Sequence, residues 1–229
     1  MAKKKQKQPE KKSNPAIAYA VFALLVIAAL VVFISLNKAP ENPKEKLPTT
    51  GDFVKLDKPT TYEPGKVKIM EIMKFDCPHC YDLHKNMPQL LKKYGDKATI
   101  TYVPIVWPKQ STKSIEAYII AEEMGKGEEM QDALFESQAL YQAKSPNGMD
   151  IMESVPAIEI VAARIGLGAD FNAKLESGYA RNASLENLKI MRGYNVEVVG
   201  TPLVIMNGNL KVNHNPVTNL DTVIGSLLS

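Results

Sequence analysis

The sequence predicts an α/β domain in which a block of helices interrupts a sheet, preceded by one N-terminal transmembrane helix. Three observations support this prediction. Every residue from Pro15 to Ile34 is apolar apart from the amphipathic Tyr19. Two strand-like segments flank a helix within residues 66–106, which is the pattern of a parallel β-α-β unit with a right-handed crossover. Residues 108–195 then show only helical patterns, and strand signals return near residue 202.

The basic charge of the chain is concentrated in its N-terminal tail. The 229 residues carry a net charge of +3. Residues 1–12 contain six lysines and one glutamate, a charge of +5, and subtracting +5 from +3 leaves −2 for the rest. The basic balance is therefore no argument for nucleic-acid binding. The composition is that of a globular protein, and the residues after 37 suffice for one domain with a sizeable core.

The apolar run predicts an uncleaved membrane anchor. About twenty helical residues span roughly 30 Å, the thickness of the hydrocarbon core. A cleaved signal peptide has a shorter apolar stretch and a cleavage site between small residues, which this run lacks, and a buried core helix would show a polar face. Because lysines precede the span, the N-terminus is expected in the cytoplasm and the rest outside. The predicted organisation is a basic tail (1–14), an anchor (15–36), a tether rich in Pro, Lys and Glu (37–50) and a folded domain (51–229).

Local signals place the elements of this domain. Asn207-Gly208 between two apolar runs predicts a hairpin, and Ser154 before Pro156 predicts the start of a helix. Thr218, with Asp221 three residues later, resembles a capping box that would begin the last helix. The expected strands are 66–75, 98–106, 202–206 and 210–212, and the expected helices are 77–95, 112–124, 127–142, 155–165, 180–193 and one after Thr218.

The only two cysteines lie in Cys77-Pro78-His79-Cys80, where a strand gives way to a helix. With Cys77 as N-cap, Pro78 occupies the first helical position, where its missing N–H has no cost. The first N–H groups and the helix dipole then favour the Cys77 thiolate and lower its pKa. A cationic His79 would stabilise the thiolate further. Cys80 lies one turn on, within reach of a disulfide, so the pair predicts redox chemistry.

Other uses of the pair are less consistent with the sequence. A structural disulfide over so short a loop would contribute little stability, and a zinc site needs a second pair of ligands. Covalent haem attachment needs a histidine where Tyr81 stands. His84 lies one turn after Cys80, so a soft-metal site such as a copper site on Cys77, Cys80 and His84 remains an alternative.

Two further features accompany the cysteines. Strand alternation places Glu71 in an apolar row, six residues before Cys77, so burial should raise its pKa. Glu71 is then a candidate to accept the proton of Cys80, unless it faces solvent on an edge strand. Thr201-Pro202 opens a strand, a position that tolerates proline, and by itself it predicts an ordinary trans bond. The other residues of the row are Val67, Ile69, Met73 and Phe75.

These residues resemble the DsbA-like thiol:disulfide oxidoreductases over about residues 51–229. The resemblance rests on Phe75-Asp76-Cys77-Pro78-His79-Cys80, on Glu71 upstream and on Gly200-Thr201-Pro202. It implies a thioredoxin fold with an inserted all-helical subdomain at about 108–195. It also implies that Pro202 is cis against the cysteine pair and that Thr201 offers its backbone to an extended substrate. Cys77 would attack, Cys80 would resolve, and no cofactor beyond their disulfide would be needed.

The sequence therefore predicts a single-pass membrane protein, expected to be monomeric, whose catalytic domain lies outside the cytoplasm. Its substrates would be exported proteins with reduced cysteines, and the resemblance implies reoxidation by a quinone-linked thiol oxidase of the membrane. A reductase or isomerase of the same fold is the alternative, because Thr201 precedes the proline and Asp76 opposes the Cys77 thiolate. A copper-delivery protein is a further alternative, whereas the intact pair argues against a passive interaction module.

Overall fold

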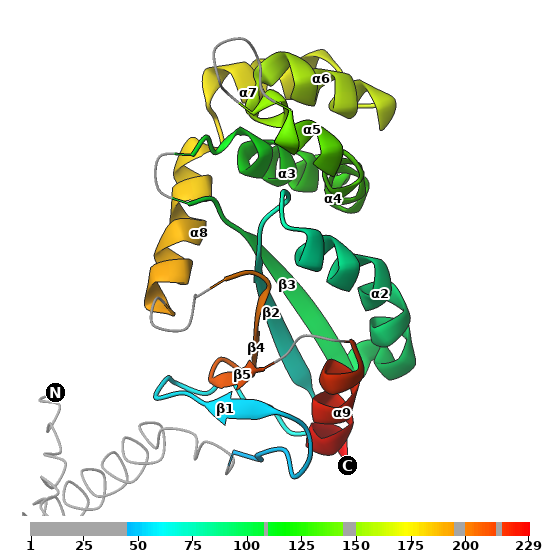
Figure 1. The fold of residues 1–229 in the computed structure, drawn as a ribbon, viewed down its shortest axis with the longest axis vertical. Helices are drawn as coiled ribbons and strands as arrows, with labels where there is room; N and C mark the ends of the chain where they lie inside the picture. Colours follow the sequence, from blue (N-terminus) through cyan, green and yellow to red (C-terminus); the bar gives the residue numbers. More distant parts are fainter. Residues whose placement is uncertain (1–44, 108–109, 144–149, 195–199, 214–216) are drawn as a thin grey trace, which may run out of the picture. The chain divides into compact units, whose positions relative to one another are not determined.

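A computed structural model describes residues 45–107, 110–143, 150–194, 200–213 and 217–229 (Figure 1). The predicted tail and anchor lie outside these residues. Among the residues that the structure describes, no helix is long and apolar enough to cross a membrane.

Five strands form one sheet in the order β1-β5-β4-β2-β3. Strand β2 runs parallel to β3 and antiparallel to β4, so the strand that leads to Cys77 lies inside the sheet, as its apolar pattern predicts. Strand β1, which the sequence analysis missed, has only three residues and pairs antiparallel with β5. The strands are β1 (Phe53–Lys55), β2 (Val67–Met73), β3 (Ala98–Pro104), β4 (Leu203–Met206) and β5 (Leu210–Val212).

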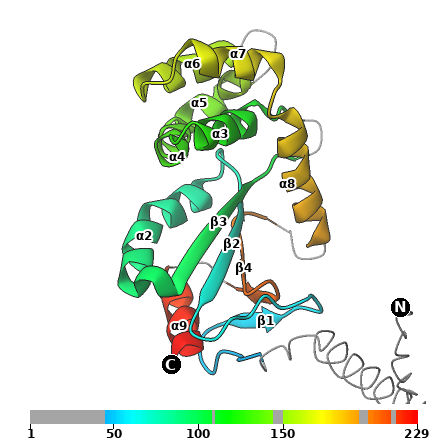
Figure 2. The same ribbon diagram turned by 180° about the vertical axis from the view of Figure 1, so that it is seen from behind.

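Helices cover both faces of this sheet (Figures 1 and 2). On one face lie α2 (Pro78–Tyr94), followed by a 3₁₀ turn (Gly95–Lys97), and α9 (Val217–Leu228). Val67 and Ile69 pack there with α2 and α9 side chains such as Leu83 and Leu220. On the other face, α8 (Arg181–Gly193) packs Leu188 and Met191 against a cluster that includes Ile72 and Val103.

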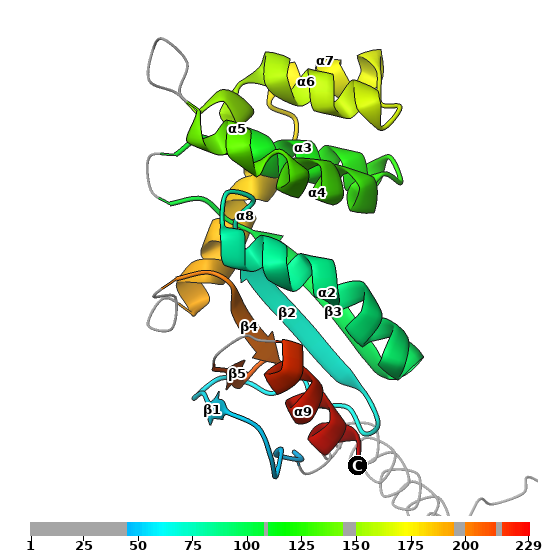
Figure 3. The same cartoon turned by 45° about the vertical axis from the view of Figure 1, so that its right-hand side comes forward.

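The remaining helices form a separate block at one end of the sheet (Figure 3). Their shared core contains Phe135 and Phe171, and it extends to Met73, Phe75 and Cys80 of the sheet side. The block thus packs directly on the cysteine end of α2. It consists of α3 (Lys113–Glu123), α4 (Gly127–Glu136), α5 (Gln138–Gln142), a 3₁₀ turn (Ile151–Glu153), α6 (Val155–Arg164) and α7 (Ala169–Ser177).

The structure differs from the sequence prediction in several elements. The predicted helix 127–142 is divided at Ser137, which ends α4. Helix α7 was not predicted, because its buried apolar face consists of only two residues, Phe171 and Leu175, which form too short a pattern. Helix α8 falls within the predicted insertion 108–195 but packs on the sheet, because Leu188 and Met191 cover its second face.

The predicted start of the last helix is wrong. Helix α9 already begins at Val217, so Thr218 lies inside it. The carbonyl oxygen of Thr218 accepts a hydrogen bond from the Thr222 hydroxyl at 2.8 Å. The Asp221 carboxylate accepts hydrogen bonds from Lys93 and Tyr94 of α2, so it joins the two helices.

The end of the predicted tether contacts the domain. Glu45 forms an ion pair with Lys55 at 2.6 Å and accepts a hydrogen bond from Asn209. The Thr49 N–H donates to the Ser226 hydroxyl at 2.7 Å. Contacts with the folded domain therefore begin before residue 51.

Candidate active site

The cysteine pair opens helix α2 at the end of the sheet that faces the helical block. Cys77 is the N-cap residue, with extended backbone angles, and Pro78 is the first residue of the helix, as predicted. Both cysteines are free thiols. Cys77 is partly exposed, whereas Cys80 is 0% exposed within the core that the helical block shares with the sheet. Only the first cysteine is therefore open to a partner.

The two thiols differ in acidity. Interactions lower the pKa of Cys77 to about 5, chiefly a hydrogen bond with the Cys80 side chain, against the effect of burial. The Thr201 side chain and, to a smaller extent, the N–H groups of Cys80 and His79 add to this, although Cys77 forms no regular capping hydrogen bond. Burial, and the hydrogen bond with Cys77, raise the pKa of Cys80. At neutral pH, Cys77 is thus a thiolate and Cys80 a thiol.

Glu71 lies on β2, within the sheet and 1% exposed. The alternative of a solvent-facing edge residue is therefore wrong. Neither of its carboxylate oxygens has a hydrogen-bond partner among the described residues. Burial, and then the negative charge of Cys77, raise its pKa to about 8. A carboxyl group with this pKa can gain or lose a proton near neutral pH, and its electrostatic effect also raises the pKa of Cys80.

The loop before β4 completes the exposed side of the pair. The Thr201–Pro202 peptide bond is cis, as the resemblance implies. The Cys77 sulfur lies 3.2 Å from the Thr201 carbonyl oxygen, to which the protonated form of Cys77 donates a hydrogen bond. The Thr201–Pro202 backbone thus lies beside the reactive sulfur.

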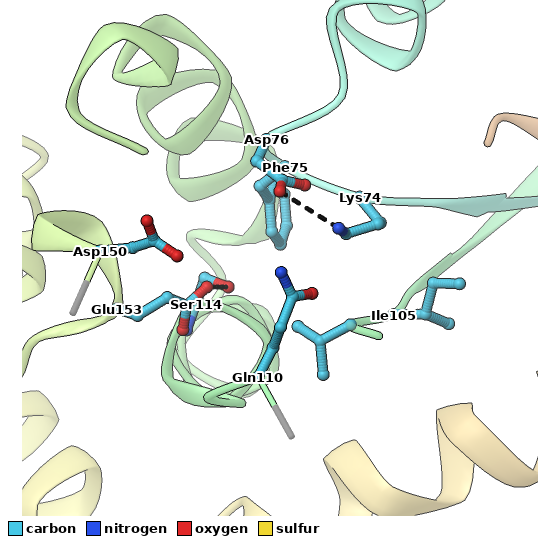
Figure 4. A pocket seen from close by; sticks show the side chains of 9 residues that line it. Lys74, Phe75, Asp76, Ile105, Gln110, Ser114, Asp150 and Glu153 are labelled. Carbon is cyan, nitrogen blue, oxygen red and sulfur yellow. Dashed lines mark hydrogen bonds and ion pairs between the residues drawn. The ribbon is translucent and has the colours of Figure 1, made fainter. Parts of the chain in front are cut away.

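The carboxylate of Asp76, next to Cys77, forms an ion pair with a buried lysine. Lys74 is buried, and its Nζ donates to the Asp76 carboxylate at 3.1 Å while lying over the Trp107 ring. A cavity of about 20 Å³ adjoins this pair, with Glu153 on its far side (Figure 4). Burial raises the pKa of Glu153 to about 7, although its hydrogen bonds with Ser114 act in the opposite direction.

One residue that positions the site was missed by the sequence analysis. The side-chain amide of Gln138, in α5, donates to the carbonyl oxygens of Phe75 and Cys77 at 3.1 and 2.9 Å. It fixes the loop that carries Cys77 to the helical block. A single glutamine in a helix has no local sequence signal for such a role.

The histidines occupy different places. His79 is exposed beside Cys77, and its thiolate-stabilising role stays a prediction. His84 is buried, and its Nε2 lies 2.6 Å from Asp132 on α4. Among the described residues, no group of three or more His, Cys, Asp or Glu side chains is arranged to hold a metal ion. In this structure, Cys77, Cys80 and His84 are thus not arranged as a three-ligand group.

The family model described as Thioredoxin matches residues 63–225, which is more than half of the chain. The chain belongs to the thioredoxin family. The thiol:disulfide interchange protein DsbA of Pseudomonas syringae pv. tomato is 23% identical to it over 189 residues, covering 82% of this chain and 84% of the relative. The protein of the same name from Burkholderia cepacia is 20% identical over 189 residues, covering 81% of this chain and 85% of the relative.

Solved structures agree with the family assignment in fold. The oxidoreductase DsbA from Xylella fastidiosa matches with a TM-score of 0.61 and 21% identity, covering 80% of this chain and 97% of that one. This likeness supports the thioredoxin-like α/β fold with its helical content. Family membership and the DsbA relatives, together with a partly exposed thiol beside a buried one, identify the chain as a protein disulfide oxidoreductase.

Proposed function

We propose that this oxidoreductase is a membrane-anchored disulfide oxidase, which acts outside the cytoplasm and transfers the Cys77–Cys80 disulfide to exported proteins. The observation that carries the proposal is the position of Cys77, partly exposed at the N-cap of α2 beside the Cys80 thiol, where its interactions lower its pKa to about 5. Interactions that stabilise the thiolate stabilise the reduced enzyme and are lost in the disulfide, so they make the disulfide a stronger oxidant.

The transfer takes two steps. A substrate thiolate attacks the Cys77 sulfur of the disulfide, and the Cys77–Cys80 bond breaks as Cys80 leaves and takes up a proton. A second substrate thiolate then attacks the substrate sulfur of the mixed disulfide, and Cys77 leaves as a thiolate. The substrate is oxidised by two electrons and the cysteine pair is reduced. The low pKa of Cys77 makes it a good leaving group for the second step.

The surroundings of the pair support a protein substrate. Cys77 is partly exposed, and the Thr201–Pro202 backbone lies beside it, so an extended segment would meet both. The DsbA relatives are described as thiol:disulfide interchange proteins. Restoring the disulfide requires an oxidant, and we propose a quinone-linked thiol oxidase of the same membrane, which would accept the two electrons.

The location rests on the N-terminal sequence. The apolar run that ends at Ile34 follows a tail with six lysines, an order that favours a cytoplasmic N-terminus. Protease added to intact cells, after removal of any envelope layer outside the cell membrane, should digest the folded domain and leave the N-terminal tail protected. A tail that is digested, or a domain that is protected, would exclude the proposed topology.

Mixing the oxidised full chain with a reduced peptide that contains two cysteines tests the direction of transfer. We expect the peptide to be almost fully oxidised within one turnover, while the Cys77→Ser variant leaves it reduced. If the peptide stays reduced, and the reduced protein instead cleaves the oxidised peptide, the protein is a reductase. A separate peptide with four cysteines and mispaired disulfides, incubated with the reduced protein, would detect isomerase activity.

A further inference from the structure

The proton acceptor beside Cys80 is closed off from solvent. Glu71 is 1% exposed, and strands β3 and β4 pair on both sides of its strand. During reoxidation, Cys80 must lose a proton before it can attack a mixed disulfide at Cys77. If Glu71 accepts that proton, which is the role that the sequence predicts for it, the proton must leave the interior in each cycle. A route from Glu71 to the surface is therefore needed.

His84 joins the interior to the surface one turn beyond Cys80. The residue is 9% exposed, and its Nδ1 is buried without a hydrogen-bond partner among the described residues. Its Nε2 lies 2.6 Å from the carboxylate of Asp132, whose side chain is 54% exposed. With the proton on Nε2 donated to this carboxylate, Nδ1 is an unprotonated base that lies in the interior.

Tyr102 is a neighbour of both His84 and Glu71. It is the register partner of Glu71 across the parallel β2–β3 pair, so the two side chains lie on the same face of the sheet. Its ring centroid is 6.4 Å from that of His84. Burial raises the pKa of Tyr102, and the charges of Glu71 and Asp132 raise it further, as expected for a ring near both carboxylates.

We infer that His84 and Asp132 form a proton-transfer pair, which carries protons between Glu71 and solvent past the side chain of Tyr102. Glu71 first gives its own proton to Nδ1 of His84, and the resulting imidazolium is held by the Asp132 carboxylate. The Glu71 carboxylate then accepts the proton of Cys80, whose thiolate attacks Cys77 and expels the partner as a thiolate. Loss of the Nε2 proton to water leaves His84 protonated on Nδ1. When Cys80 next leaves the disulfide and takes up a proton, Nδ1 returns its proton to Glu71 and Nε2 takes one up from water, which restores the starting state. His84 acts through Glu71 and is a positioning residue rather than a catalytic one.

Other groups around His84 also influence its protonation. On α4, Asp132 contacts the imidazole directly, and Phe135 stacks on it. Glu128 of the same helix contributes a negative charge near Tyr102. On α2, Lys85 lies over the Tyr81 ring, which also stacks on Phe135.

The contact between His84 and Asp132 also links α2 with α4 of the helical block. The test must therefore distinguish proton transfer from a purely structural role. His84→Gln separates the two roles, because the glutamine amide keeps an N–H donor for Asp132 but cannot take up a proton. Asp132→Asn is the matching change on the other side, since its amide oxygen still accepts from Nε2 but no longer stabilises an imidazolium. Glu129→Gln is the control, because Glu129 is an exposed carboxylate of α4 that pairs with Lys126.

The test measures how fast Cys80 resolves a mixed disulfide. The full chain is loaded at Cys77 with the chromophoric aromatic thiol thionitrobenzoate, and release of that thiol is followed from about pH 5 to pH 9. At neutral pH we expect release to slow at least about tenfold in His84→Gln and several-fold in Asp132→Asn, within the range of general acid–base effects. Added imidazole should accelerate His84→Gln but not the wild type or Glu129→Gln.

Unchanged release rates and pH profile in a folded His84→Gln would overturn the inference. A slower rate that imidazole does not restore would also count against it, because a displaced helix would give that result. The inference rests on the proposed function only through reoxidation, in which Cys80 resolves a mixed disulfide at Cys77. Since release by Cys80 is a rate and the direction of transfer depends on the reduction potential, either idea can fail without the other.

Discussion

The acidic thiol of Cys77 should make the stability of the reduced protein depend on pH. The folded protein lowers the pKa of this thiol to about 5, against an ordinary value of 9.0. A group whose pKa is lowered on folding contributes stability that is fully present above its unfolded pKa. This contribution is lost as the pH falls towards the folded pKa. The contribution should therefore increase from about pH 5 to pH 9.

The size of this effect follows from the shift. Between the folded pKa of about 5 and pH 7 lie two pH units, which correspond to about 2.7 kcal/mol as an upper limit. Cys77 is partly exposed, so solvent screening reduces its interactions, and we expect about 1–2 kcal/mol at pH 7. Replacing Cys77 with serine removes the titrating group and should remove this contribution.

Denaturant unfolding of the reduced wild type and the reduced Cys77→Ser variant at several pH values measures the effect. Glu71 is present in both proteins, so its opposite pH dependence is largely common to them. Its pKa is raised to about 8, and its contribution is therefore lost as the pH rises towards 8.

We expect the stability difference between the two proteins to be small at pH 5 and to grow towards pH 8. A difference that stays constant over this range would show that Cys77 has an ordinary pKa in the folded protein. The oxidised wild type provides the control, because its disulfide has no thiol to titrate.

Three further predictions follow from the same site. Alkylation of the reduced protein should modify Cys77 with a midpoint near pH 5 and leave Cys80 intact, and equal labelling of both would contradict the burial of Cys80. Glu71→Gln should slow thiol release by Cys80 several-fold and stabilise the protein above pH 8, as release kinetics and denaturant unfolding can establish; unchanged kinetics would remove Glu71 from the mechanism. Phe135→Ala should destabilise the protein by about 3–5 kcal/mol in denaturant unfolding, because the ring fills the core shared by the helical block and α2; a loss below about 1 kcal/mol would contradict that packing.

Local sequence rules predicted the reactive end of the site. The N-cap position of Cys77 follows from a strand, a proline at the first helical position and a helical pattern. The burial of Glu71 follows from strand alternation. Both depend on residues close together in the chain, which is why they were predictable. The cis bond before Pro202 was predictable only through the family resemblance, since sequence alone favours trans.

Contacts between distant elements were not predictable in this way. Gln138 reaches Phe75 and Cys77 from the helical block, and Asp132 meets His84 across two helices. No pattern within either segment indicates its partner. The prediction that the last helix begins at Thr218 was wrong for a related reason. Asp221, which resembled part of a capping box, instead joins α9 to α2.

The reduction potential of the full chain, determined by equilibration with glutathione at several pH values, tests the central claim most directly. A Cys77 pKa of about 5 should raise the potential at pH 7 by roughly 60 mV over a pair with an ordinary first thiol. Above pH 5, where reduction takes up one proton instead of two, the potential should fall by about 30 mV per pH unit. His79→Ala should lower the potential if the imidazole stabilises the thiolate. A potential near the −270 mV typical of thioredoxin, falling by about 60 mV per unit from pH 5 to pH 8, would contradict the oxidase assignment and favour a reductase.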